Sequence, residues 1–360
     1  MGNLWIALSA AIKYLGGEIV IPPYTNKKTL SIGTKHSPEA VCLPYKLVLG
    51  NYIQAIESGA EALIMIRSPG LCRLGQYSDI TKTALIDLGY DIEFIDFDLY
   101  TSKFIELYAG FKRATGNNNP IDLINAVRLS VKKMRMLDKV DEIAHYYRPR
   151  EAEQGSSDKW YRLTLAEIDK ALTVKECREV YDFVRNEAGK IKIDRNREII
   201  NIDVTGEIYV VLDAFANMEM EKELGKLGVQ VRRHLSVSSW IDRILVPSLL
   251  SFSETHGEKA SRYAKDYLRR DIGGDAIESI GDTAYAAESN ADGIIHLLPF
   301  TCMPEIIAQN ILPNIRNDKD IPFLSLVLDE FTGRAGFITR LEAFVDLTRR
   351  RKKNKQLLSA

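Results

Sequence analysis

The sequence predicts an α/β protein in which two parallel β-sheets are separated by a helical insertion. Short runs of continuous apolar residues, such as Ala62–Ile66 and Gly293–Leu298, alternate with helical segments in both halves of the chain. Such runs are typical of strands that are buried on both faces of a parallel sheet. Residues 101–195 are helical and charged instead, without a convincing strand. We therefore expect a first α/β domain over 1–100, a helical layer over 101–195 and a second α/β domain over 196–360.

The first domain is expected to begin with a helix over residues 4–15, followed by a short strand at Glu18–Ile21. Ser37-Pro38-Glu39 has the pattern of a helix start, so we expect a helix that carries Cys42 and is kinked or restarted at Pro44. The other strands predicted in this domain are Ala62–Ile66 and Asp91–Phe97. A chain that begins with a helix lacks the strand that would normally precede it. We therefore suspect one more strand upstream, in the natural product or in a relative.

The second domain is predicted from a series of β-type and helical patterns that begins near Ile199. The expected strands are Gly206–Asp213, Val229–Arg232, Gly293–Leu298 and Pro322–Leu328, and the expected helices are Ala216–Leu227 and Gly336–Lys352.

Composition excludes several classes of function. The 360 residues are 46% hydrophobic and 27% charged with a formal net charge of −1, which does not favour nucleic acid or an acidic membrane surface. The basic run Arg349–Lys353 complements the dipole of a helix end. No apolar run reaches the roughly 20 residues that span a bilayer, and the start has no basic region of a secretory signal. Four cysteines without close spacing indicate a reducing compartment, so we expect a cytoplasmic protein.

The four cysteines fall into two kinds of sequence context. Cys42, Cys72 and Cys302 lie in stretches flanked by proline or glycine, whereas Cys177 lies in a plain helical stretch. Apolar strands lead directly into the loops of Cys72 and Cys302, and ligands bind beyond the carboxyl ends of parallel strands. A helix start at Cys42 would favour thiolate over thiol. The pattern predicts that these three thiols meet at one cleft.

Several interpretations of these cysteines stay open at the level of the residues. There is no C-x-x-C pair, and spacing alone favours small buried side chains. Zinc would need a histidine as the fourth ligand, and the candidates are His36, His145, His234, His256 and His296. His36 is the best of them, while His296 in its apolar strand is more typical of a core residue. A nucleophilic-cysteine enzyme would need only one thiol and one base. Three thiolates on a four-iron cluster would leave one iron open.

Polar residues near the expected cleft are further candidates. They could tune a cluster or contact a substrate, or they could be first-turn acids and solvated loop charges. These residues are Glu39, Arg73, Thr301, Glu305, Glu330 and Arg334. The sequence has no phosphate-binding loop of the G-x-x-x-x-G-K-[ST] type, so ATP would be bound by another protein.

Longer motifs around the cysteines carry a resemblance to a known family. They are Ser-Pro-Glu-Ala-Val-Cys42-Leu-Pro, Ile-Arg-Ser-Pro-Gly-Leu-Cys72, Leu-Pro-Phe-Thr-Cys302-Met-Pro-Glu, Leu-Asp329-Glu330-Phe-Thr-Gly-Arg-Ala-Gly336 and Thr-Arg340-Leu-Glu-Ala-Phe344. With these motifs, over nearly its whole length, the chain resembles the 2-hydroxyacyl-CoA dehydratase component superfamily. It is most similar to the branch known as CoA protein activase or activase-associated protein.

The resemblance implies two Rossmann-like domains and an oxygen-sensitive [4Fe-4S] or double-cubane [8Fe-9S] cluster held by Cys42, Cys72 and Cys302. It also implies an electron-injecting, ATP-hydrolysing activator protein as partner, an acyl-CoA or other small reducible substrate, and a homodimer or a heterodimer with a related subunit. The chain would then be a dehydratase (a lyase) or a reductase-like enzyme component. A cluster-bearing electron carrier and a metal-free, small-molecule-binding α/β protein are the alternatives.

Overall fold

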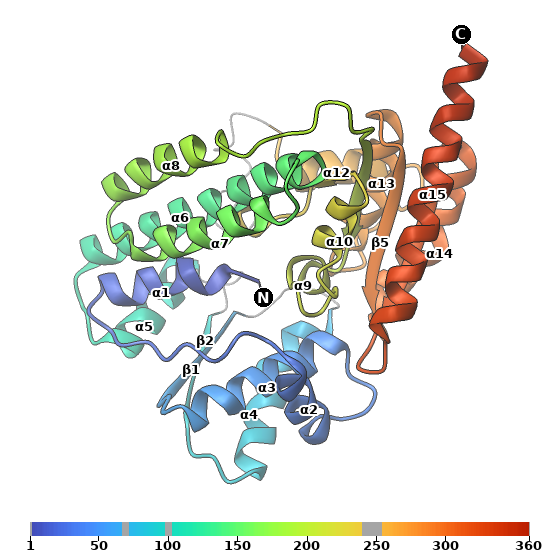
Figure 1. Cartoon of the computed structure of the whole chain (residues 1–360). Helices are drawn as coiled ribbons and strands as arrows, with labels where there is room; N and C mark the ends of the chain where they lie inside the picture. The colour runs from blue at the N-terminus through green and yellow to red at the C-terminus, as the bar shows by residue number, and fades with distance from the viewer. Residues whose placement is uncertain (1, 67–71, 98–102, 240–253, 360) are drawn as a thin grey trace.

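The computed structural model of the protein describes residues 2–66, 72–97, 103–239 and 254–359 (Figure 1). Within these ranges the chain is an α/β protein with two separate sheets, and every pair of neighbouring strands is parallel. The predicted fold class is therefore confirmed at this level. Among the helices of the described ranges, none combines the length and apolar composition that crossing a membrane requires.

The smaller sheet has two strands, β1 (Ala62–Ile66) and β2 (Glu93–Phe97), with Ala62 opposite Glu93 and Ile66 opposite Phe97. Three helices accompany it: α2 (Lys27–His36), α3 (Leu43–Glu57) and α4 (Tyr77–Asp87). Tyr45, Leu49 and Ile53 of α3 pack with Leu63 of β1 in one apolar core. Both predicted strands are confirmed, although β2 is two residues shorter than expected.

The larger sheet has four strands in the order β4-β3-β5-β6. They are β3 (Ile200–Gly206), β4 (Val229–Arg233), β5 (Gly293–Pro299) and β6 (Phe323–Leu328). β5 is buried along its whole length. Because side chains alternate between the two faces of a strand, Ile295 and Leu297 enter one apolar core and Ile294 enters another.

Helices cover both faces of this sheet. The core around Ile295 includes side chains of α9 (Ile208–Leu212), α10 (Met220–Lys226) and α15 (Arg334–Ser359). Helices α12 (His256–Ala264), α13 (Ala276–Glu288) and α14 (Met303–Lys319) pack together in a further core. The expected C-terminal helix is confirmed, and α15 is longer than predicted.

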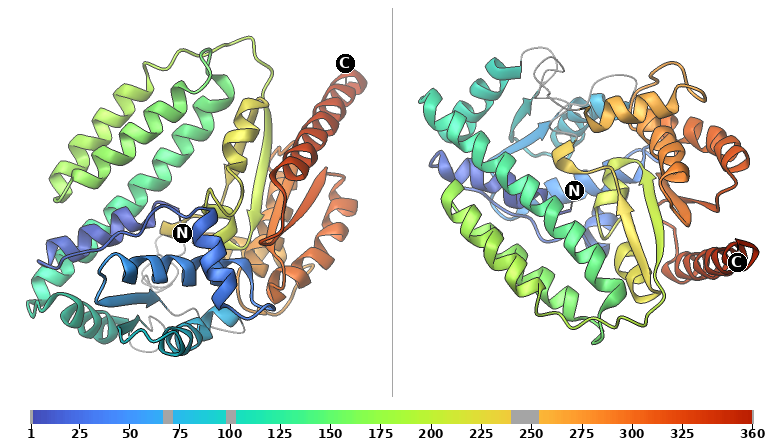
Figure 2. Two further views of the ribbon diagram at one scale, coloured as in Figure 1. Left: turned by 60° about the horizontal axis from the view of Figure 1, so that its bottom comes forward. Right: turned by 90° about the horizontal axis from the view of Figure 1, so that it is seen from above.

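A layer of helices forms the third part of the molecule. It contains α5 (Lys103–Thr115), α6 (Pro120–Tyr147), α7 (Ser156–Lys170) and α8 (Val174–Ala188), with the single-turn η2 (Arg148–Arg150) between α6 and α7. Helices α6, α7 and α8 pack side by side (Figure 2). The first helix, α1 (Leu4–Tyr14), packs on α6 through Ile6 and Ala10. The helical content predicted for this region is confirmed, and the domain boundaries stay a prediction.

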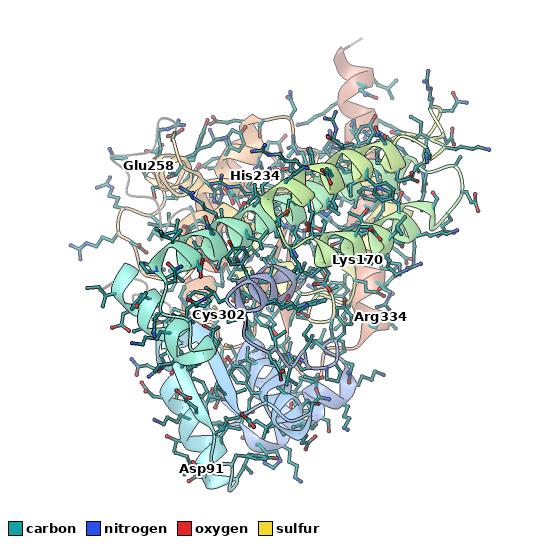
Figure 3. The ribbon with its side chains drawn as sticks, turned by 90° about the vertical axis from the view of Figure 1, so that its left-hand side faces the viewer. Asp91, Lys170, His234, Glu258, Cys302 and Arg334 are labelled. Atoms are coloured by element: carbon teal, nitrogen blue, oxygen red, sulfur yellow. The ribbon has the colours of Figure 1, made fainter. Side chains whose placement is uncertain are left out.

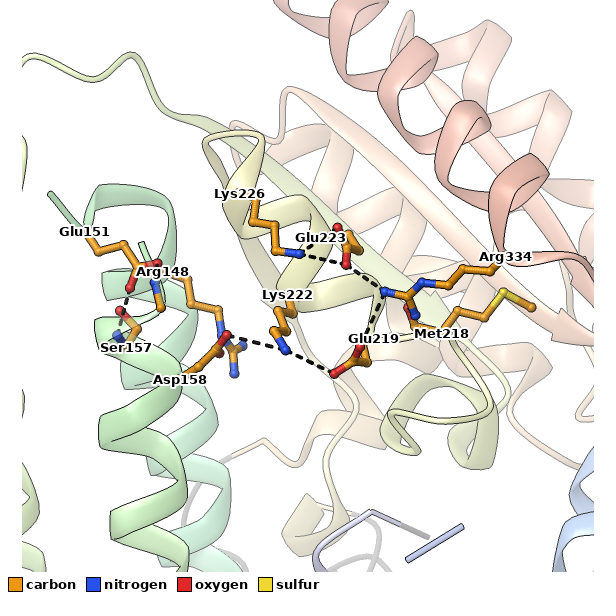
Figure 4. Close-up of polar contacts among 11 residues, drawn as sticks. Arg148, Glu151, Ser157, Asp158, Met218, Glu219, Lys222, Glu223, Lys226 and Arg334 are labelled. Carbon is orange, nitrogen blue, oxygen red and sulfur yellow. Dashed lines mark hydrogen bonds and ion pairs between the residues drawn. The ribbon is translucent and has the colours of Figure 1, made fainter. Parts of the chain in front are cut away.

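Ion pairs connect this layer to the helices of the larger sheet (Figure 4). Asp158 of α7 binds Arg148 at 2.8 Å and Lys222 of α10 at 3.8 Å. Lys222 binds Glu219 at 3.2 Å, and Glu219 also lies 3.4 Å from Arg334 at the start of α15. Because these ion pairs are partly exposed, each contributes little to the free energy of folding. Their main effect is to fix the position of the helical layer against the helices of the larger sheet.

The strand predicted over residues 206–213 is wrong, because β3 ends at Gly206 and the next residues form α9. Gly206 has a φ of 136°, and a Cβ atom there would lie 1.9 Å from the carbonyl oxygen of Leu297. Only glycine permits this approach of two backbones. The side chain of Glu207 then accepts a hydrogen bond from Val210 N at 3.0 Å, which caps the new helix. This local capping outweighs the strand propensity of Ile208–Leu212.

Three other expected elements also differ from the structure. The helix predicted over 216–227 is reduced to α10, because Asp213 Oδ1 binds Phe215 N and Ala216 N and holds the chain in turns. Residues 18–21 form no strand. Ser37 does not start a helix: it ends α2, and the helix α3 begins after Cys42 with Pro44 in its first turn rather than at a kink.

Candidate functional site

Two of the predicted site cysteines occupy equivalent positions at the starts of helices. Cys42 is the N-cap of α3 and Cys302 is the N-cap of α14. In both cases a proline, Pro44 or Pro304, stands two residues later in the first turn. Proline fits there because its missing N–H would have no partner in a first turn. Figure 3 shows Cys302 near the centre of the molecule, and its side chain is buried.

Cys72 lies directly before a single helical turn, η1 (Arg73–Gln76), and its carbonyl oxygen accepts a hydrogen bond from Gly75 N at 3.1 Å. The preceding part of its predicted loop, residues 67–71, lies outside the described residues. Gly274 connects Cys72 to the helix of Cys302. A Cβ atom on Gly274 would lie 4.0 Å from the Cβ of Cys72 and 2.9 Å from the Cγ of Pro304. Cys72 therefore lies close to the first turn of α14.

Electrostatic interactions show that the three thiols share one neighbourhood. A charge on Cys72 raises the pKa of Cys42, and a charge on Cys42 raises the pKa of Cys302. Both Cys42 and Cys72 raise the pKa of Tyr77 in the same way. Together with the contacts of Gly274 and a hydrogen bond from Arg73 to the carbonyl oxygen of Ala40, they place the segments of the three cysteines next to one another. Their role as ligands stays a prediction.

The pKa values of Cys42 and Cys302 are raised, which favours the thiol at neutral pH and corrects the expectation that the helix start at Cys42 favours thiolate. Burial is the main cause that raises the pKa of Cys42 to about 12, and a charge on Glu207 adds to it. Burial and Glu207 also raise the pKa of Cys302 far above its usual range. The Tyr77 hydroxyl, 2.6 Å from Cys42 Sγ, acts in the opposite direction. A metal that binds here would therefore have to displace protons from the thiols.

Glu207 was not predicted as a site residue, because it fell inside a supposed strand. Burial raises its pKa from 4.5 to about 7, although two backbone N–H groups of α9 lower it. Its charge acts on Cys42, Cys302 and Tyr77. The signal that could have found it is its place directly after Ile200–Gly206, where apolar and polar residues alternate as in a strand, because this puts it at the carboxyl end of that strand.

Glu305, one of the predicted candidates, lies in the first turn of α14 and is fully buried. Its Oε2 lies 2.7 Å from His296 Nε2 and accepts a hydrogen bond from Ser279 at 2.9 Å. The other ring nitrogen of His296 is 3.1 Å from Ser325 Oγ. His296 is therefore the hydrogen-bonded core residue that the sequence suggested. Glu305 Oε1 has no hydrogen-bond partner among the described residues.

Thr301, which precedes Cys302, has an unusual backbone conformation. Its φ is 68°, a left-handed value that is strained for a β-branched residue. Its Oγ1 atom is buried and finds no hydrogen-bond partner in the part of the chain that the structure describes. Strain and unsatisfied polar atoms often accompany functional sites.

Four other predicted candidates have structural partners. Arg73 donates to the carbonyl oxygen of Ala40 at 3.1 Å, which links the Cys72 segment to the Cys42 segment. Lys46 in α3 binds the carboxylate of Glu330 and, at 3.3 Å, the carbonyl oxygen of Glu39. Arg334 makes the pairs of Figure 4 with α10. Sequence reasoning missed Lys46, whose buried amine connects the first turn of α3 to the loop that precedes α15.

The structure gives the zinc alternative no support. In residues 2–66, 72–97, 103–239 and 254–359, no three His, Cys, Asp or Glu side chains are arranged to hold a single metal ion. His145, His234 and His256 each direct Nε2 to a carboxylate, at 2.9, 2.8 and 2.9 Å. His36, the best candidate in the sequence, ends α2.

The three thiols are of the donor type that an iron–sulfur cluster requires. In such a cluster each thiolate binds a different iron, so the three sulfurs need not converge on one ion. Three neighbouring thiols are present, and buried polar atoms without partners, Thr301 Oγ1 and Glu305 Oε1, lie on both sides of Cys302 in the sequence. Comparison with protein-family models and with curated proteins found no match to this chain.

Proposed function

We propose that this protein is an iron–sulfur protein that performs low-potential reductive chemistry, fed by a separate ATP-hydrolysing activator. Cys42, Cys72 and Cys302 would hold a [4Fe-4S] or double-cubane cluster, and the cellular setting would be the reducing cytoplasm. The proposal includes the family relationship to 2-hydroxyacyl-CoA dehydratase components. It also includes the arrangement of two Rossmann-like domains around a helical insertion.

The observation that carries the proposal is that the segments of three cysteines lie next to one another, two of these cysteines at N-caps with the same Cys-x-Pro sequence. Helix N-termini stabilise negative charge, which offsets part of the cost of burying thiolates. When bound, a cluster with three protein thiolates would supply one-electron chemistry and an open iron.

The chain's own residues would prepare that site. Tyr77 is positioned to fix the side chain of Cys42, because its hydroxyl lies 2.6 Å from the sulfur. Arg73 holds the Cys72 segment against the Cys42 segment. Glu207, with a pKa of about 7, can hold or release a proton near the thiols at physiological pH. Burial of Cys302 and Glu305 would keep water away from this side of the site.

The test is activity that depends on both the activator and ATP. The protein would be reconstituted with iron and sulfide under strict anoxia and mixed with an ATP-hydrolysing activator and a 2-hydroxyacyl-CoA. Turnover that requires both, and that is lost in Cys302→Ser but kept in Cys177→Ser, would support the enzyme. Electron uptake without turnover would identify a carrier instead. A protein that takes up no iron under anoxia would overturn the proposal.

A further inference from the structure

A polar cavity of about 600 Å³ lies beside the edge strand β4, away from the cysteines. One wall is formed by β4 and the residues that follow it, and the opposite wall by α6. Its lining residues are Gln230, Val231, Arg232, Arg233, His234, Ser236 and Ser238 on one side and Arg135, Asp138, Lys139, Asp141, Glu142 and His145 on the other. In Figure 3, His234 on this wall is clearly separated from Cys302. The volume suits a small metabolite.

Most charges of the lining neutralise one another. Arg233 is held between Asp141 at 2.6 Å and Glu221 at 2.7 Å. Lys139 binds Glu142 at 2.7 Å. Asp138 accepts a hydrogen bond from the backbone N–H of Ser238 at 3.1 Å. These groups form the walls of the cavity, and because their charges are already paired they offer little electrostatic attraction to a ligand.

Arg232 is different, because part of its guanidinium group is not satisfied. Its Nε binds Asp203, and its Nη1 donates to the carbonyl oxygen of Ser289 at 3.0 Å. Its Nη2 is buried and has no acceptor among the described residues. A buried donor of a charged group without an acceptor costs about 1–3 kcal/mol or more, so an acceptor is expected at this place.

Other polar side chains line the cavity together with Arg232. His234 shares the carboxylate of Asp203, with Nε2 at 2.8 Å from Oδ2, which fixes the ring at the cavity wall. The hydroxyl groups of Ser236 and Ser238 belong to the same lining. A fixed guanidinium with an unpaired N–H is the kind of donor that recognises an oxyanion.

We propose that this cavity is a second ligand site, which binds a small metabolite through a phosphate or carboxylate group held by Arg232, in a lining that also contains Ser236, Ser238 and His234. The site is independent of the cysteines. Its ligand would lie at the carboxyl end of β4, beside the residues that follow this strand.

The test uses the full chain without iron, titrated by calorimetry with inorganic phosphate and, separately, with malonate as a carboxylate probe. Saturable binding of either probe is expected, and the stronger one identifies the oxyanion. Arg232→Gln should weaken it about ten- to a hundredfold, since one charge-assisted contact is lost. The matched control is Arg262→Gln, which removes an exposed pair with Glu254 and should leave the affinity unchanged.

Arg232→Gln also loses its bond to Asp203, so a second variant protects the test against misfolding. Ser238→Ala keeps the backbone contact with Asp138 and should weaken binding several-fold, with an unchanged melting temperature. Absence of saturable binding for both probes, or full affinity in Arg232→Gln, would overturn the proposal. The binding measurement does not depend on iron. The ligand-site proposal can therefore fail while the iron–sulfur proposal stands, and the iron–sulfur proposal can fail while the ligand-site proposal stands.

Discussion

Cys177 and the three helix-start cysteines are the same residue type in two very different surroundings. Cys177 is completely buried inside α8 and packs with Trp160 and Val184 in the apolar core of the helical layer. Burial raises its pKa, and Lys133 partly offsets the shift. Cys42, Cys72 and Cys302 lie among other thiols, carboxyl groups and polar atoms without partners. Burial alone therefore does not separate a packing cysteine from a candidate ligand, whereas the neighbouring chemistry does.

Among the substitutions that test this difference between Cys177 and the other cysteines, Lys46→Met is expected to have the largest effect on stability and on thiol reactivity. Lys46 lies one turn after Cys42, and its buried amine binds Glu330, so the substitution leaves a carboxylate without its partner. Loss of one member of a buried pair typically costs about 3–5 kcal/mol. We expect a decrease of this size in the free energy of unfolding, measured by urea denaturation, and faster alkylation of Cys42 while Cys177 stays unreactive.

Lys139→Met is the matched control, because Lys139 belongs to an exposed pair with Glu142. It should change the free energy of unfolding by less than about 1 kcal/mol. Equal effects of the two substitutions would contradict the structural role given to Lys46.

Glu207→Gln is expected to make stability depend on pH in a defined direction. Since the pKa of Glu207 is raised from 4.5 to about 7, the folded state keeps a proton that the unfolded state has lost between these values. Stability of the wild type therefore falls as the pH rises through this window. Glutamine cannot ionise, so the variant should be more stable than the wild type by about 2–3 kcal/mol at pH 8 and nearly equal at pH 4.

Urea denaturation at the two pH values measures this difference. Glu254→Gln, at an exposed position paired with Arg262, is the control and should show no such gain at pH 8. A constant difference between Glu207→Gln and the wild type at both pH values would show that Glu207 is not a buried acid.

A smaller effect is expected from Tyr77→Phe, which removes the hydroxyl 2.6 Å from Cys42 Sγ. The loss of one hydrogen bond costs about 1 kcal/mol. Because this hydroxyl lowers the pKa of Cys42, its removal should raise that pKa further and slow alkylation of Cys42 at pH 9. Tyr52→Phe removes a comparable bond, to the carbonyl oxygen of Ile64 at 2.7 Å, and should leave alkylation unchanged. Equal rates in the two variants would rule out an influence of Tyr77 on the thiol.

The sequence predicted the strands of both sheets well where apolar runs were continuous, as in Ala62–Ile66 and Gly293–Leu298. It failed where side chains bind the nearby backbone. Ile208–Leu212 has strand composition but forms α9, because Gly206 turns the chain against Leu297 and Glu207 caps the turn. That outcome depends on a contact 91 residues away in sequence, which no local pattern contains.

The sequence likewise predicted some features of the candidate site and missed others. The prolines near Cys42 and Cys302 are visible in the sequence and mark two real helix starts. Glu207 and Lys46 were missed, since each obtains its surroundings from distant segments. Arg334 was a candidate by position in a motif, but its partners Glu219 and Glu223 place it in an ion-pair network between helices.

The most direct test of the central claim is the iron content per chain after anaerobic reconstitution, compared between Cys302→Ser and Cys177→Ser. We predict about four irons per chain, or eight for a double cubane, in the wild type and in Cys177→Ser, and the loss of most iron in Cys302→Ser. A wild-type chain without iron, or a Cys177→Ser variant that loses iron while Cys302→Ser keeps it, would contradict the account.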